Sequence, residues 1–221
     1  MKYCQGMNEV VKRRRQYDAT SRQTRSAATR QRIIDAARDL ILEGGYRATT
    51  IAAIAARAEV NSDSVYALVG RKPVVLRELI EQALSGTDHA VAGEDRAHIR
   101  AMREENDPAK KLAIYARGTC QVHQRLAPLF LALRDASSTE PEAQQVWQEI
   151  SERRATNMRR LVKDLRDSGG LRRGLSIEES ADIVWATNSP ELYVLLVGER
   201  GWPVKRFEKW LAESWCRLLL Q

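Results

Sequence analysis

The sequence lacks the residue patterns on which most enzyme active sites and metal centres depend. Its three cysteines, Cys4, Cys120 and Cys216, are too few and too far apart for a disulfide framework. Cys120 and His123 lie one helical turn apart, but no second pair of metal ligands is near them, which favours a packing role. A nucleophile elbow, a phosphate-binding loop and a dinucleotide fingerprint are also missing. We therefore expect no enzymatic activity, no catalytic residues, no metal and no cofactor.

Long apolar runs are missing as well. The best candidate, residues 192–197, is far shorter than the ~20 residues that a membrane-spanning helix needs, and it indicates a core segment. The basic N-terminus is not followed by the apolar stretch of a secretion signal. Both absences predict a cytoplasmic protein without a membrane partner.

No segment alternates apolar and polar residues in the manner of a half-buried strand, so the sequence predicts an all-α fold. The chain has 221 residues, of which 43% are hydrophobic, enough for one large domain or two small ones with a buried core. Helical periodicity is found instead. The main helices that it predicts cover residues 27–42, 107–126, 128–136, 139–167 and 203–221.

Positive charge is concentrated at the N-terminus. The first 32 residues contain nine basic and two acidic side chains, a surplus equal to the formal net charge of +7 of the whole chain. A basic arm of this kind would contact DNA phosphates. A disordered, solubilising tail has the same composition, and an arm that is disordered in solution can also become ordered on DNA. We predict a flexible basic arm over residues 1–25.

Residues 48–72 carry the most informative pattern in the chain. Apolar residues recur on one face of a short predicted helix, at Ile51, Ile54, Ala55 and Ala58. Residues 59–60 then form a turn, and Asn61 suits the N-cap of a second short helix. The inward face of that second helix carries Val65, Leu68 and Val69.

Two short helices joined by a tight turn form the layout of a helix-turn-helix DNA-binding unit. The outer side of the second helix would meet DNA with Asn61, Ser62, Asp63, Ser64 and Tyr66. The same layout occurs in helical domains that never contact DNA, but the basic stretch before it favours the DNA-binding interpretation. We expect a DNA-binding domain over residues 26–72 and a second helical domain over residues 73–221.

On these residues the sequence resembles the TetR family of bacterial transcriptional regulators. The matching positions are the helix 33–42, the turn 44–46 and the segments Thr49-Thr50-Ile51, Ile54-Ala55, Ala58-Glu59-Val60, Val65-Tyr66 and Arg71-Lys72. Glu59 departs from the family pattern, which usually has glycine there, and costs on the order of 1 kcal/mol if its φ is positive. Val69 stands where an aromatic residue often packs under the recognition helix.

The resemblance implies an all-helical homodimer that binds double-stranded operator DNA and is released from it, as a repressor, by a small-molecule effector bound in the C-terminal body. Carried over by position, Thr49 or Thr50, Tyr66 and Lys72 would contact phosphates, while Ser62, Asp63 and Ser64 would face bases. Arg25 and Arg30 would follow the DNA backbone or pair with acidic residues of their own helix.

The second domain offers large side chains on separate predicted helices as candidates for the effector pocket: Tyr115, His123, Phe130, Trp147, Trp185 and Tyr193. Aromatic residues at helical spacing more often belong to a plain core, and this alternative stays open. The last helices also carry a dense apolar face with Trp185, Trp210 and Trp215, which predicts a four-helix interface with a second copy.

One other function is compatible with these patterns. An effector-free dimeric DNA-binding adaptor, or a helical interaction protein, would use the same residue types, because a cavity and a solid core have similar linings.

Overall fold

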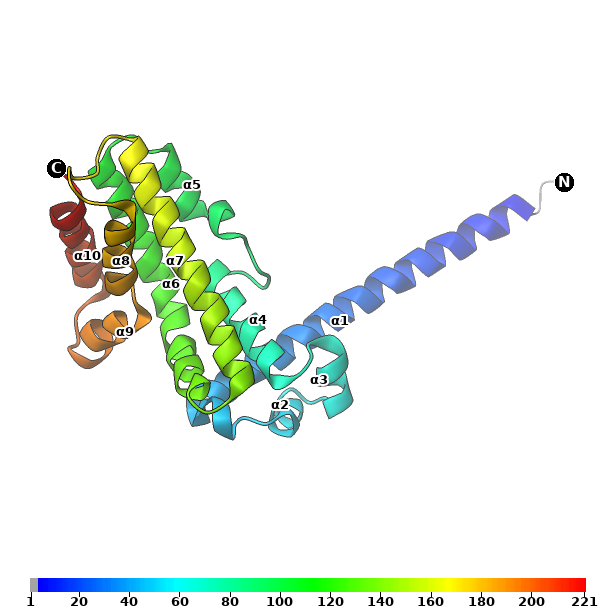
Figure 1. The fold of residues 1–221 in the computed structure, drawn as a ribbon. Coiled ribbons are helices and arrows are strands. Elements are labelled where there is room, and N and C mark those ends of the chain that lie inside the picture. Colours follow the sequence, from blue (N-terminus) through cyan, green and yellow to red (C-terminus); the bar gives the residue numbers. More distant parts are fainter. Residues whose placement is uncertain (1–3) are drawn as a thin grey trace. The chain divides into compact units, whose positions relative to one another are not determined.

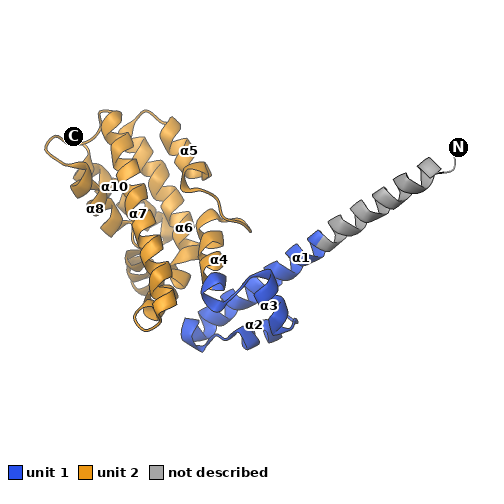
Figure 2. Ribbon diagram, turned by 45° about the vertical axis from the view of Figure 1, so that its right-hand side comes forward, with its two compact units in different colours: residues 1–75 blue, residues 76–221 orange. Residues whose placement is uncertain are grey.

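The computed structural model describes the backbone of residues 4–221 and the side chains from residue 23 onward. Apart from an isolated bridge between Leu171 and Leu220, the regular structure of these residues is helical (Figure 1), which confirms the all-α prediction. The chain divides into two compact units, residues 1–75 and residues 76–221 (Figure 2). In the part of the chain that the structure describes, every helix is too short or too polar to span a bilayer.

The first unit is built from α1 (Cys4–Ala48), α2 (Ile51–Arg57), α3 (Ser62–Leu68) and the start of α4 (Lys72–Ser85). Its core contains the apolar residues that the helical periodicity selects: Ile33, Ile34, Ala37, Ile41, Ile54, Ala55 and Val65. Because α2 and α3 have only seven residues each, they depend on this packing for their stability.

The helix predicted over residues 27–42 is longer in the structure. α1 begins at Cys4, since no glycine or proline interrupts residues 7–26, and it leaves helical geometry at Gly45, whose φ is 79°. The predicted basic arm falls almost wholly on residues whose side chains are not described. Its flexibility and its contact with DNA therefore stay predictions.

The second unit contains the rest of α4 and the elements that follow it. These are η1 (Gly93–Asp95), α5 (Ala97–Glu104), α6 (Pro108–Ser137), α7 (Pro141–Asp167), α8 (Ile177–Thr187), α9 (Pro190–Tyr193), the π-helical segment η2 (Val194–Glu199) and α10 (Val204–Leu219). α6 packs against α5, α7, α9 and α10, and therefore forms the centre of this unit.

The sequence predicted two helices where the structure has the single helix α6. Pro128 lies inside this helix, although proline lacks the N–H that the helix needs and typically costs ~3 kcal/mol in a helix interior. Its neighbours Ala127, Leu129 and Phe130 are buried, whereas Pro128 itself is exposed. Burial of the inner face therefore outweighs the lost hydrogen bond.

Trp215 belongs to the core of the second unit. It is fully buried, its Nε1 donates to Thr187 Oγ1 at 2.7 Å, and its ring lies 5.5 Å from that of Tyr115. The prediction that placed Trp215 in an interface with a second copy is wrong. Within one chain its side chain is already completely buried and its indole N–H already has a hydrogen-bond acceptor.

Candidate nucleic-acid interface and internal cavity

The turn between α2 and α3 has the tight geometry of a helix-turn-helix. The Glu59 N–H donates to the Ala56 carbonyl at 3.2 Å and the Val60 N–H to the Ala55 carbonyl at 3.0 Å, which closes the end of α2. Glu59 has a φ of 56°, the only positive value at a non-glycine residue in the described part. The strain expected from the sequence is therefore present.

Asn61 is the N-cap of α3, as predicted. Its Oδ1 accepts from the Ser64 N–H at 2.8 Å and from the Ser64 hydroxyl at 2.6 Å. Both side chains are thus engaged in holding the start of the helix. Of the predicted base-facing residues, Asp63 is exposed and Ser62 and Ser64 are half-buried.

Tyr66 projects from α3 on the side opposite the buried Val65. Its side chain is 53% exposed, whereas Val65 is completely buried. A large aromatic side chain on a short exposed helix gains little from the core of its own unit. Its hydroxyl is therefore available to a phosphate oxygen.

The two threonines that were predicted to contact phosphates have different environments in the structure. The Thr49 side chain is buried and its hydroxyl donates to the Gly45 carbonyl at 2.9 Å, so we remove Thr49 from the candidate phosphate contacts. Thr50 is exposed and accepts from the Ala53 N–H at 3.1 Å, which caps α2. Thr50 remains the candidate of this pair.

Lys72 is held against the end of α1. Its Nζ lies 4.0 Å from the centre of the Tyr46 ring and donates to the Arg47 carbonyl at 3.5 Å. On α1, Arg25 is exposed and Arg30 is half-buried. The predicted cationic contacts therefore lie on α1 and at the start of α4, outside the recognition helix.

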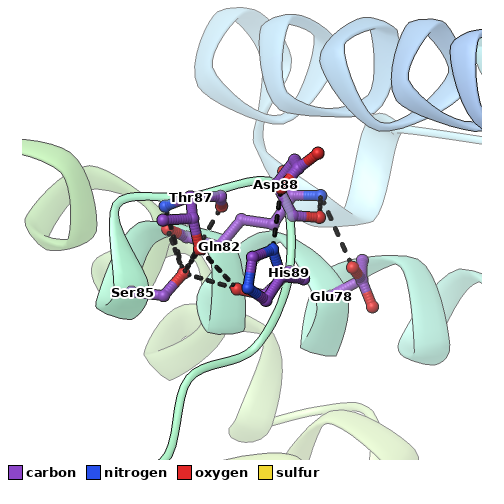
Figure 3. A network of polar contacts seen from close by, with 6 residues as sticks. All are labelled: Glu78, Gln82, Ser85, Thr87, Asp88 and His89. Carbon is purple, nitrogen blue, oxygen red and sulfur yellow. Dashed lines mark hydrogen bonds and ion pairs between the residues drawn. The ribbon is translucent and has the colours of Figure 1, made fainter. Parts of the chain in front are cut away.

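The last turn of α4 is fixed by a network of polar contacts (Figure 3). The Gln82 side-chain amide donates to the Asp88 carbonyl at 3.0 Å, the Ser85 hydroxyl donates to the His89 carbonyl at 2.7 Å, and the His89 ring contacts Asp88 Oδ1 at 2.8 Å. Arg125 of α6 adds a bond from its Nε to the Ala83 carbonyl at 3.1 Å. The end of α4 is thus tied to the body of the second unit.

The second unit contains a partly open cavity of about 110 Å³. Leu84 of α4 lines it together with residues of η1, α5, α6 and α7 and with Asn188, which follows α8. Of the predicted pocket residues, Tyr115 and His123 line this cavity.

Phe130, Trp147, Trp185 and Tyr193 do not line the cavity. The Phe130 and Trp147 rings pack on each other at 4.6 Å, Tyr193 meets Phe207 edge to face at 5.4 Å, and Trp185 is 38% exposed. The prediction for these four residues is corrected: three stabilise the core through ring packing and one lies at the surface.

A chain of hydrogen bonds crosses the wall of the cavity. His123 Nε2 lies 3.0 Å from Asn188 Oδ1, Asn188 Nδ2 donates to the Tyr115 hydroxyl at 3.1 Å, and that hydroxyl donates to Met158 Sδ at 3.5 Å. Burial lowers the pKa of His123 to about 3 and raises the pKa of Tyr115 to about 12. Both groups are therefore neutral near pH 7.

His98 is a further neutral histidine on the cavity wall. Burial, with Arg96 and Arg125 close by, lowers its pKa to about 4. Its ring fills the space beside Gly118 of α6, where a Cβ atom would lie 2.3 Å from the imidazole carbons. Glycine at this position therefore lets the ring reach the cavity.

Arginine is the dominant charged residue of the cavity wall. Arg96, Arg103, Arg153, Arg154 and Arg160 line it, against Glu94 and Asp164. The Arg154 guanidinium donates to the carbonyls of Asn188 at 2.5 Å and Trp185 at 3.3 Å, at the C-terminal end of α8. Burial lowers the pKa of both Arg96 and Arg154.

Four residues of the cavity wall were not predicted as site residues: Arg96, His98, Arg154 and Asn188. One signal was available for Arg154: it stands four residues from both Ile150 and Met158, so an arginine interrupts the apolar stripe of α7. The other three lie in loops or in a short helix, where no periodicity marks a buried position.

A comparison with known protein families finds one match, within the first unit. Residues 33–68 match the family model described as bacterial regulatory proteins, tetR family. This segment runs from the buried face of α1 through the turn to the end of α3. No curated protein matches the chain.

Solved structures share the whole fold. The fatty acid degradation regulator FadR from Bacillus halodurans superposes with a TM-score of 0.70 at 20% identity, covering 85% of this chain and 94% of that one. FadR from Bacillus subtilis in complex with stearoyl-CoA gives 0.68 at 19% identity, covering 84% and 97%. A transcriptional regulator from Saccharomonospora viridis in complex with choline gives 0.65 at 17% identity, covering 87% and 97%.

These likenesses show a common fold, and the family match lies on the helix-turn-helix that the geometry defines. Residues 33–68 therefore carry the helix-turn-helix that the tetR family model describes, in a chain whose fold is shared with solved transcriptional regulators.

Proposed function

We propose that the protein is a repressor that binds a roughly palindromic operator as a homodimer and is released when a small molecule occupies the cavity of the second unit. Thr50, Tyr66 and Lys72 would contact phosphates, and Ser62 and Asp63 would face base edges. Asn61 and Ser64 would mainly hold the recognition helix in shape.

The observation that carries this proposal is the course of α4. Lys72, its first residue, packs on Tyr46 in the DNA-binding unit, and Leu84, near its last, lines the cavity. A ligand that displaces Leu84 would act on the helix that enters the DNA-binding unit. α4 continues over 14 residues, so its backbone would be the route for such coupling.

Ligands of related folds support a small-molecule effector. The complexes with stearoyl-CoA and with choline show that regulators of this fold accept chemically different molecules. Here the wall is rich in arginine, which favours anionic over cationic molecules.

Apolar side chains at the surface support the homodimer. Trp185 of α8, Leu195 of η2 and Leu218 of α10 are 38%, 47% and 42% exposed. Exposed large apolar residues on neighbouring elements of one unit are typical of a subunit interface.

DNA binding is tested by fluorescence anisotropy on the upstream intergenic DNA, with scrambled DNA as control and a salt titration. We expect Tyr66→Phe to weaken specific binding about tenfold, because one hydrogen bond to a charged oxygen is lost. Lys72→Gln should lower the salt slope by about one unit. Lys209→Gln, which removes the same charge from an exposed position of α10, should change neither quantity.

Equal, salt-sensitive binding to both DNA fragments would contradict a sequence-specific regulator. Specific binding that no ligand class reverses would instead favour an effector-free dimeric adaptor.

A further inference from the structure

We propose that the effector is a small aromatic acid that carries a hydroxyl donor, with the hydroxyl bound by His123 and the carboxylate by Arg96. This inference rests on the proposed function and names the chemistry of its ligand.

The first support is an unused hydrogen-bond acceptor. An amide oxygen can only accept, so the proton of the neutral His123 ring lies on Nε2, which faces Asn188 Oδ1 at 3.0 Å. Nδ1 is then a bare acceptor, and it is buried without a partner among the described residues. A ligand that donates a hydrogen bond at this point removes the cost of that unsatisfied atom.

The second support is the balance of charge. Arg153 pairs with Glu81 at 2.6 Å, Arg160 with Glu94 at 3.3 Å, and Asp164 with Lys111 at 2.7 Å. Glu94 and Asp164, the two acidic residues of the cavity wall, therefore both have a cationic partner.

Arg96 and Arg154 have no carboxylate partner in the described part of the chain. Arg154 is bound by carbonyls, but the Nε of Arg96 is buried without a partner, and its side chain otherwise donates only to the Val91 carbonyl at 3.5 Å. An anion at Arg96 gains a charge-assisted hydrogen bond, whereas a cation at the same place would be repelled by the guanidinium.

The volume of the cavity limits the size of the ligand, and the burial of His123 and Arg96 indicates its orientation. A cavity of about 150 Å³ holds one benzene ring, and the cavity here is about 110 Å³. The two volumes are of the same order, which favours a ligand with a single ring over one with a long acyl chain. His123 is only 3% exposed and Arg96 remains partly exposed. The hydroxyl therefore points inward, and the carboxylate lies at the mouth.

Isothermal titration of the full chain tests this with three matched probes: 4-hydroxybenzoate, benzoate and 4-hydroxybenzylamine. We expect 4-hydroxybenzoate to bind, benzoate to bind about tenfold more weakly because it lacks the donor, and the amine not to bind. Arg96→Gln should weaken 4-hydroxybenzoate about tenfold. Arg159→Gln, an exposed residue of α7 outside the cavity, should leave its affinity unchanged.

Equal affinities for benzoate and 4-hydroxybenzoate would overturn the role of His123. Binding of the amine, an unchanged affinity of Arg96→Gln, or no binding of any probe would overturn the ligand class.

A measurement of operator release by 4-hydroxybenzoate tests the ligand class and the effector mechanism separately. If 4-hydroxybenzoate binds but the anisotropy of operator-bound protein does not fall, the ligand class stands and effector release fails. If only a different ligand releases the operator, release stands and the ligand class is wrong.

Discussion

Glu59 is the residue at which the sequence conflicts most directly with the local backbone. Its φ of 56° lies in the left-handed region, where a side chain costs about 1–2 kcal/mol relative to glycine. The turn nevertheless forms, because Ile54, Ala55 and Val65 are buried on either side of it. Packing of the two helices therefore imposes a conformation that Glu59 disfavours.

We predict that Glu59→Gly stabilises the protein by up to about 1 kcal/mol, since relief of the strained φ exceeds the added flexibility of the unfolded chain. Chemical denaturation measures this change. Glu59→Ala is the matched control, because it removes the carboxylate but keeps the Cβ atom and the strain. An equal gain in both variants would assign the effect to charge and contradict the backbone explanation.

Single residues also show how far a sequence can define a site. Asn61 was predicted as a cap from its residue type and position, and the structure confirms it. Tyr115 and His123 were chosen with four other large side chains on separate predicted helices, and these two do line the cavity. Arg96 and Asn188 could not be chosen, because polar residues in loops become buried only through tertiary packing.

At the scale of single helices, α8 matters because the chain that leaves it supplies Asn188 to the cavity wall. Its start has a capping box: the Ser176 hydroxyl accepts from the Glu179 N–H at 3.1 Å, and the Glu179 carboxylate accepts from the Ser176 N–H at 3.1 Å. Two of the unpaired N–H groups at this helix start are thereby satisfied.

We predict that Ser176→Ala lowers the free energy of unfolding by about 1 kcal/mol. Thermal or chemical denaturation measures the loss. Ser137→Ala is the control, because the Ser137 hydroxyl bonds only the Arg134 carbonyl near the end of α6 and caps no helix start. Equal effects of the two substitutions would show that the capping box contributes nothing specific.

Helix boundaries were harder to predict than helix types. Residue patterns identified the helices that correspond to α1, α2, α3, α6, α7 and α10, but Pro128 was taken as a boundary and lies within α6. A local rule on proline fails there because the inner face of α6 is buried against four other elements. Only the tertiary structure reveals that compensation.

At the scale of the molecule, the two units differ in the features that they contain, and the chain passes from one to the other within α4. The first unit holds a strained turn and an exposed recognition helix, while the second has a cavity with unsatisfied polar atoms. Unsatisfied buried groups cost stability, so their retention is consistent with a binding site rather than a solid core. The sequence alone did not distinguish these two possibilities, because the same aromatic residues serve both.

The homodimer is the prediction that belongs to the whole molecule. We expect sedimentation equilibrium at micromolar concentration to give the mass of two chains, and Leu218→Glu to shift the protein toward the monomer. A charge at an apolar interface loses the burial of leucine and adds a desolvation cost, which together weaken association by about a hundredfold or more.

Val74→Glu is the matched control, because Val74 is also exposed, at 46%, but lies in the first unit. Its variant should remain a dimer. A monomeric wild type would remove the interface altogether. A monomer produced by Val74→Glu but not by Leu218→Glu would move it to the DNA-binding unit, and the exposed apolar residues of α8, η2 and α10 would then need another partner.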